Sequence, residues 1–111
     1  MAVTPKVFVQ SQQIAAEQTN QYTASQVTAI IDKCTVTNTS ASNVAITINI
    51  IPSGGVAEVG NRVINARTIA PGEAYTCPEM IGHVLSSGDI LSTLATSGGA
   101  LSLRVSGREV T

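Results

Sequence analysis

One short stretch of the chain has the residue types needed for hydrolysis. His83 is the only histidine, and Ser86, Ser87 and Asp89 follow it closely. A serine hydrolase needs a nucleophile on a strained turn and a base that is oriented by a buried carboxylate. Residues of a single turn seldom reach that geometry, so we interpret His83 as a structural or exposed residue. We expect no catalytic residues in this chain.

Metal and cofactor binding have equally little support. Cys34 and Cys77 are far apart in the sequence, and neither forms a C-x₂-C or H-x₃-H spacing with His83. The stretch that begins at Pro52 (PSGG) resembles a fragment of a phosphate-binding loop, but the Gly-Lys-Ser/Thr end is missing. We therefore expect no metal site and no cofactor. Free buried thiols are the expected state of the two cysteines, with a long-loop disulfide as the alternative.

The charged residues are few and scattered. They make up 12% of the chain, with a net charge of −1, against about 25% in an average soluble domain. Because no basic stripe could displace counterions from phosphates, we expect no nucleic-acid partner. No stretch approaches the apolar length of a membrane span, and the N-terminus lacks a signal-peptide pattern. We expect no membrane partner and a protein made in the cytoplasm.

The composition predicts a sheet protein whose function is contact rather than catalysis. Val, Ile and Thr together supply about a third of the 111 residues, and these β-branched side chains pack well on a pleated sheet. A chain of this length forms a single domain, residues 1–111. Turn signals every 8–12 residues favour an all-β fold, an antiparallel sandwich or barrel of seven or eight strands.

Alternation of apolar and polar residues gives the expected strands. It is clearest from Val44 to Ile50, and we expect this strand to form a hairpin with the one before it. In that preceding strand Ile30, Cys34 and Val36 share a face with Asp32, which predicts a bulge or a partner for the carboxylate. Residues 14–20 could form a short helix, and residues 80–85 a strand or one helical turn. The expected strands are residues 6–13, 21–25, 29–37, 44–50, 62–69, 73–77, 90–95 and 101–110.

The order of these segments resembles a known family of phage proteins. An apolar strand leads into PSGG in a long loop, followed by a strand that ends in IAPGE, a Gly-Asp-Ile-Leu segment and SGGALSLRVSGREV. This pattern, over about residues 28–111, is similar to the capsid staple (decoration) proteins of epsilon-fifteen-like short-tailed bacteriophages. The resemblance implies a jelly-roll-like sandwich on the outer surface of an icosahedral capsid. It also implies a homodimer that bridges neighbouring copies of the major capsid protein, and no enzymatic role.

Two segments are candidates for contact with such a partner. One is a possible extended N-terminal arm, residues 1–8, and the other is the long Gly- and Pro-containing loop of residues 52–61, which we expect to be exposed and mobile. Exposed sheet edges are further candidates. The candidate contact residues are Val3, Pro5, Lys6, Phe8, Pro52, Gly54, Gly55, Val56 and Val59.

Two other functions stay open at this point. A receptor- or glycan-binding sandwich module of a phage tail fibre is the alternative, and it would need Tyr22 and Tyr75 side by side as an aromatic platform. A small hydrolase centred on His83 is the third possibility.

Overall fold

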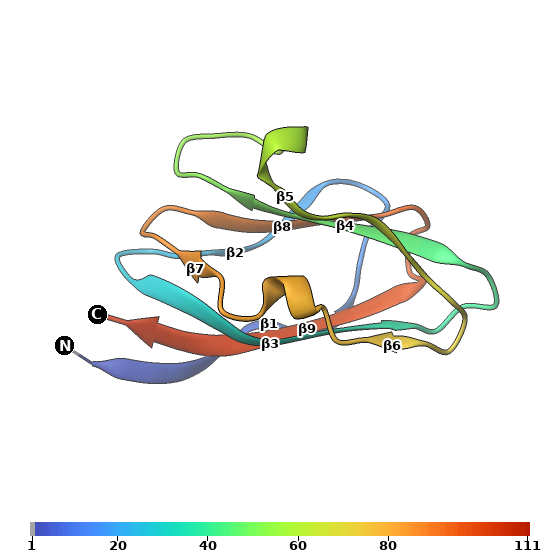
Figure 1. Ribbon diagram of the computed structural model, residues 1–111, viewed down its shortest axis with the longest axis horizontal. Coiled ribbons are helices and arrows are strands. Elements are labelled where there is room, and N and C mark those ends of the chain that lie inside the picture. The colour runs from blue at the N-terminus through green and yellow to red at the C-terminus, as the bar shows by residue number, and fades with distance from the viewer. Residues whose placement is uncertain (1) are drawn as a thin grey trace.

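The computed structural model describes residues 2–111, which form two antiparallel sheets packed face to face (Figure 1). A single core lies between the sheets. Two short 3₁₀ helices, η1 (Val59–Asn61) and η2 (Pro78–Met80), interrupt the strands. No helix within residues 2–111 has the length and apolar character needed to cross a membrane. The strands are β1 (Val3–Gln13), β2 (Thr19–Thr23), β3 (Thr28–Asn38), β4 (Val44–Ile51), β5 (Arg62–Ile69), β6 (Ala74–Tyr75), β7 (Val84–Leu85), β8 (Ile90–Ala95) and β9 (Leu101–Val110).

The strand order is that of a jelly roll. One sheet has the order β1-β9-β3-β6, with β7 also paired to β3, and the other has the order β2-β8-β4-β5. Every connection except β4–β5 and β6–β7 crosses from one sheet to the other, which is how an eight-strand jelly roll wraps its chain. The predicted antiparallel sandwich is therefore confirmed, and β7 is the strand added to the eight.

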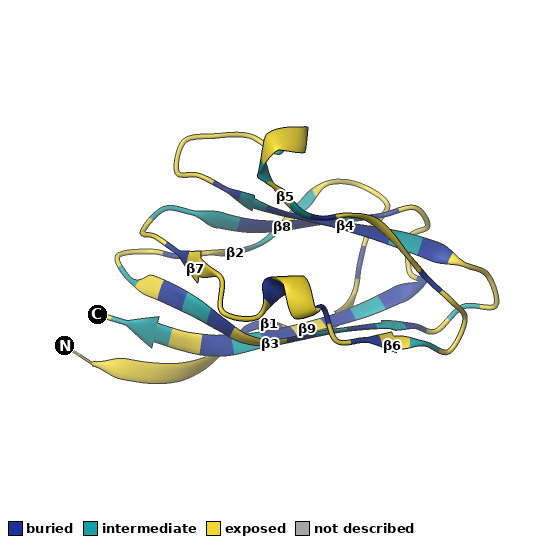
Figure 2. Ribbon diagram, in the orientation of Figure 1, coloured by how far each residue is buried: buried dark blue, intermediate teal, exposed yellow. Residues whose placement is uncertain are grey.

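The core is built by alternation along the central strands. In β4, Val44, Ile46 and Ile48 are buried in the core, and in β9 Leu101 and Leu103 are buried while Ser102 is only partly buried and Arg104 is exposed (Figure 2). Successive side chains on a strand point to opposite faces, so these residues converge between the sheets. Val105 continues this buried row in β9.

The expected hairpin between β3 and β4 is wrong. The two strands lie in different sheets, and the segment between them crosses the end of the sandwich. Asn38, which is fully buried, holds this crossing: its Nδ2 donates to the carbonyl oxygens of Ser42 and Ile69, both at 2.8 Å, and its Oδ1 accepts from Ser40 N at 2.9 Å. Both strands need an apolar partner face, and opposite sheets provide it. Hairpin pairing would have placed these strands side by side in one sheet.

The expected disturbance at Asp32 is present in β3. The register with β9 shifts between Ile31 and Lys33. The Asp32 carboxylate accepts hydrogen bonds from Nε and Nη2 of Arg108, both at 2.9 Å. Because of this bulge the core receives Ile31, whereas Ile30 is only partly buried. The expectation that Ile30 shares the inward face with Cys34 is therefore corrected.

The short helix considered for residues 14–20 is not formed. Residues 14–18 form a loop rather than a short helix, and β2 starts at Thr19. Pro71 and Gly72 form a type II turn after β5: Glu73 N donates to Ala70 O at 3.0 Å, and Gly72 has φ +77°. A type II turn requires that positive φ at its third position, where glycine carries no strain.

Tyrosines close both open sides of the sandwich. On the side of β1 and β2, Tyr22 stacks on Phe8 with ring centroids 4.4 Å apart, and its hydroxyl donates to Glu109. On the opposite side, the Arg67 guanidinium lies 4.4 Å from the ring centroid of Tyr75. The Tyr75 hydroxyl donates to Glu79, which lies in η2. Each tyrosine thus covers apolar core with its ring and binds a carboxylate at the rim.

The Tyr75 hydroxyl makes the free energy of unfolding depend on pH in the alkaline range. Burial, the hydrogen bond to Glu79 and the charge of that carboxylate raise the pKa of Tyr75 to about 12, whereas an unfolded tyrosine ionises near pH 10. Unfolding therefore releases a proton between these values, so the stabilisation present below about pH 10 is lost as the pH rises toward about 12. Urea unfolding of wild type and Tyr75→Phe should show the two stabilities converging over this range. If the difference in unfolding free energy between wild type and Tyr75→Phe stays constant over this pH range, the raised pKa of Tyr75 is contradicted.

Candidate partner-binding surface

The N-terminal segment is part of the sandwich rather than a free arm. From Val3 onward it belongs to β1, which forms one edge of its sheet and pairs with β9 from Val3↔Val110 to Gln13↔Ser102. Val3 and Pro5 are exposed and available to a partner. Phe8 is buried against Tyr22, so its proposed contact role is corrected: its ring packs in the core because a bulge between Val7 and Val9 turns it inward.

The free edge of β1 is poorly suited to pairing with a further strand. Pro5 has no N–H to donate, and the register with β9 shifts between Val7 and Val9 and again between Val9 and Gln12. Proline, lysine and bulges are the features by which edge strands avoid additional pairing. Side chains, rather than the β1 backbone, are therefore the groups that this edge offers to a partner.

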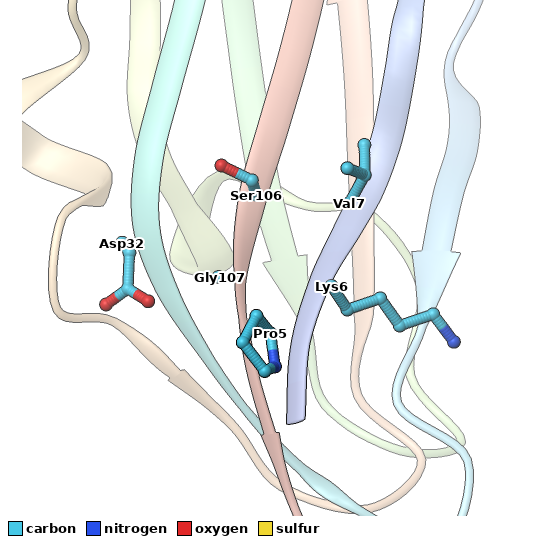
Figure 3. Close-up of a pocket in the computed structure, with 6 residues that line it drawn as sticks. All are labelled: Pro5, Lys6, Val7, Asp32, Ser106 and Gly107. Atoms are coloured by element: carbon cyan, nitrogen blue, oxygen red, sulfur yellow. The ribbon is translucent and has the colours of Figure 1, made fainter. Parts of the chain in front are cut away.

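The first half of β1 borders a shallow hollow on the outer face of its sheet (Figure 3). Its volume is about 400 Å³. Asp32 at its border is paired with Arg108, and the Lys6 amine points away from the hollow to Glu109, 3.4 Å distant. With these charges partnered, the hollow presents apolar and hydroxyl groups and no free charge aimed at a ligand. The lining residues are Pro5, Lys6, Val7, Asp32, Ser106 and Gly107.

The 52–61 loop is exposed, as expected, but its backbone is held in place. Asn49 reaches out of β4 and donates from Nδ2 to Glu58 O at 3.0 Å and to Asn61 Oδ1 at 2.6 Å. Asn61 in turn donates to Val56 O at 2.9 Å. At the other end of the loop, Ser53 N donates to Asp89 Oδ1 at 3.1 Å. The expected mobility is therefore opposed by hydrogen bonds at both ends of the loop.

This loop presents apolar side chains to solvent. Val56 and Val59 are 71% and 74% exposed, the highest values among the large exposed hydrophobic residues of the described chain. Gly54, with φ +79°, and Gly55, whose N–H donates to Pro52 O at 2.8 Å, shape the turn that precedes them. Exposed valines on an ordered loop give a partner an apolar contact at little entropic cost.

The two candidate segments lie at the same end of the sandwich. The start of β1, the C-terminus and the first part of the 52–61 loop are at the left of Figure 1, with the loop above the upper sheet and β1 in the lower one. A partner at this end would meet both segments. The sequence did not reveal the residues that organise this end, Asn49, Asn61 and Asp89. The one available signal was Asn49, a polar residue within an aliphatic strand.

The residues considered for hydrolysis do not form a triad. The Asp89 carboxylate accepts from two backbone groups, Ser86 N at 2.9 Å and Ser53 N at 3.1 Å, and so ties two loops together. His83 is exposed and interacts with β3 through its backbone, since Ile31 N donates to His83 O at 3.0 Å. Over residues 2–111, no group of three His, Cys, Asp or Glu side chains is arranged to hold a metal ion.

The two tyrosines do not form an aromatic platform. Tyr22 lies in β2 and Tyr75 in β6, which are edge strands of different sheets on opposite sides of the sandwich. Each ring is already covered, Tyr22 by Phe8 and Tyr75 by Arg67. A sugar ring normally stacks on a free aromatic face, so the geometry does not support the glycan-binding alternative.

Comparison with known proteins gives no match: no protein-family model, no curated protein and no solved structure is similar to this chain at a significant level. The fold is thus established by the strand order itself. What the protein does is a proposal from its surface and from the resemblance described above.

Proposed function

We propose that this protein is a structural virion protein that binds the outside of an icosahedral phage capsid. In this role it bridges neighbouring major capsid subunits as a homodimer and stabilises the shell. The segment order resembles that of capsid staple proteins, and the jelly-roll sandwich agrees with the fold which that resemblance implies. The sparsely charged surface suits extended contact with a protein lattice.

The observation that carries the proposal is the ordered apolar loop. Val56 and Val59 are exposed on a backbone that Asn49 and Asn61 hold in position. An isolated exposed apolar residue needs no explanation, but two on one preorganised loop would give a partner an apolar contact at little entropic cost. Burial of both side chains in a capsid pocket would contribute about 3 kcal/mol.

Two contact segments on one small domain would allow it to bridge two capsid subunits that meet at this end. The 52–61 loop and the Val3–Pro5 part of β1 lie at the same end but on different sheets, so each can meet a different capsid subunit. Contacts that are weak one by one become strong when a second site is engaged intramolecularly. Binding only to the assembled shell then stabilises that shell by mass action.

The loop valines provide a direct test. We expect the double variant Val56→Ser/Val59→Ser to bind preformed shells of the phage that encodes this chain at least about tenfold more weakly than wild type, because the apolar contact is removed. Co-sedimentation with shells measures the affinity. The melting temperature of the free variant should be unchanged, since both side chains are already in water.

Val84→Ser is the matched control. Val84 is 51% exposed but lies in β7, outside both candidate segments, so this variant should bind as wild type does. Shells carrying the wild-type protein should rupture at a higher temperature than bare shells. Equal rupture temperatures, or equal binding by the loop variant, would refute the proposed role.

A further inference from the structure

The two cysteines, which are distant in sequence, are brought together by the β3–β6 pairing. The register is Val36↔Tyr75 and Thr37↔Ala74. Continuing it by two residues places Cys34 opposite Cys77. Both side chains are fully buried and reduced. Interaction with the Cys77 thiol, together with burial, raises the pKa of Cys34.

The backbone at Cys77 is held in an unusual conformation. This residue has φ +48° and ψ +59°, in the left-handed region, and it immediately precedes Pro78. Both its β-carbon and the following proline disfavour such a helical conformation. Its own thiol donates to Tyr75 O at 3.6 Å. Strain of this kind is retained where it positions a functional group, and here it occurs at a buried thiol that the strand register places opposite Cys34.

We propose that Cys34 and Cys77 are a disulfide-forming pair that links β3 to the segment between β6 and β7. With oxidised glutathione as the oxidant, one cysteine thiolate attacks a glutathione sulfur and releases the first glutathione as a thiol. The second cysteine thiolate then attacks the protein sulfur of this mixed disulfide and releases the second glutathione. Two protein thiols are oxidised to one disulfide, and one glutathione disulfide is reduced to two thiols.

Burial determines when this reaction occurs. Neither sulfur is accessible to solvent in the folded chain, and a buried thiol rarely forms the reactive thiolate. The segment of residues 76–83 must therefore open first. It is attached to β3 through β6, a strand of two residues, and through backbone bonds such as Gly82 N to Ile31 O at 2.8 Å. Such short elements are the ones that open locally before the whole domain unfolds. The inference does not depend on the proposed capsid role.

The test compares wild type with Cys34→Ser and Cys77→Ser. Each protein is refolded from urea in a buffer of reduced and oxidised glutathione, and, in parallel, incubated folded in the same buffer. Refolded wild type should lose two hydrogen masses, and peptide mapping should show Cys34 joined to Cys77. The folded sample should reach the same product more slowly. Each single variant should show only one glutathione adduct.

The melting temperature provides a second measurement. Oxidised wild type should melt about 5 °C or more above the same sample reduced with dithiothreitol, because the bond closes a long loop in the unfolded chain. The single variants should show no such difference. The inference is overturned if wild type gives glutathione adducts on both cysteines, gives disulfides between chains, or stays reduced after refolding.

Discussion

Gly107→Ala should lower the free energy of unfolding by about 3 kcal/mol or more, and the melting temperature by about 10 °C or more. A Cβ at this position would lie 2.0 Å from the carbonyl oxygen of Ile30 and 2.8 Å from Cε2 of Phe8. The oxygen belongs to the backbone of β3, which pairs with β9 on both sides of this point, so it cannot move without disturbing the ladder. The Phe8 ring fills the space that glycine leaves.

Gly98→Ala is the matched control for this substitution. A Cβ at Gly98 would meet Ala16 N at 3.5 Å, an ordinary van der Waals contact, in the turn before β9. Its stability should stay within about 0.5 kcal/mol of wild type. Thermal melts followed by circular dichroism measure both variants. Similar melting temperatures for the two would show that the close approach of β9 to β3 at Gly107 is not a constraint on the fold.

Asn38→Ala should destabilise the protein by about 3 kcal/mol. The substitution removes the two donors that satisfy Ser42 O and Ile69 O, and the acceptor of Ser40 N. Asn38 is fully buried, so the substitution removes three hydrogen bonds at the end of the sandwich core. Each lost hydrogen bond costs about 1 kcal/mol, and the lost packing adds to this. Chemical denaturation measures the change.

Asn43→Ala, in the same connection between β3 and β4, provides the comparison. Asn43 is exposed, so its removal should change stability by less than about 0.5 kcal/mol. If both variants unfold at the same denaturant concentration, the Asn38 network does not hold the β3–β4 crossing. The expected difference would instead show that a single amide stabilises the point where the chain passes from one sheet to the other.

Strand positions were predictable because the alternation of side chains is a local property. The pattern from Val44 to Ile50 gave β4 to within one residue of its end, and the Pro71-Gly72 turn followed from backbone conformations that those two residues prefer. The disturbance at Asp32 was also visible, because a charged residue on an apolar face requires a bulge or a partner. Local sequence could not show that the bulge puts Ile31 rather than Ile30 into the core.

The contact surface was predictable only in part. Gly and Pro identified the 52–61 loop as exposed, which Val56 and Val59 confirm. The hydrogen bonds that hold the loop backbone in place were not predictable, because the amide that makes them belongs to Asn49 in β4. Phe8 was misassigned for a similar reason: its burial depends on Gly107 and Tyr22, which are distant in sequence.

By itself, the sequence determined an all-β fold with an aliphatic core and few charged residues, because composition and alternation act residue by residue. Tertiary structure alone decided which sheet each strand joins, as the separation of β3 from β4 shows, and which distant residues meet, as Cys34 and Cys77 do. The physical reason is that any apolar strand face can be buried against several others. Only the packing of all of them together selects one arrangement.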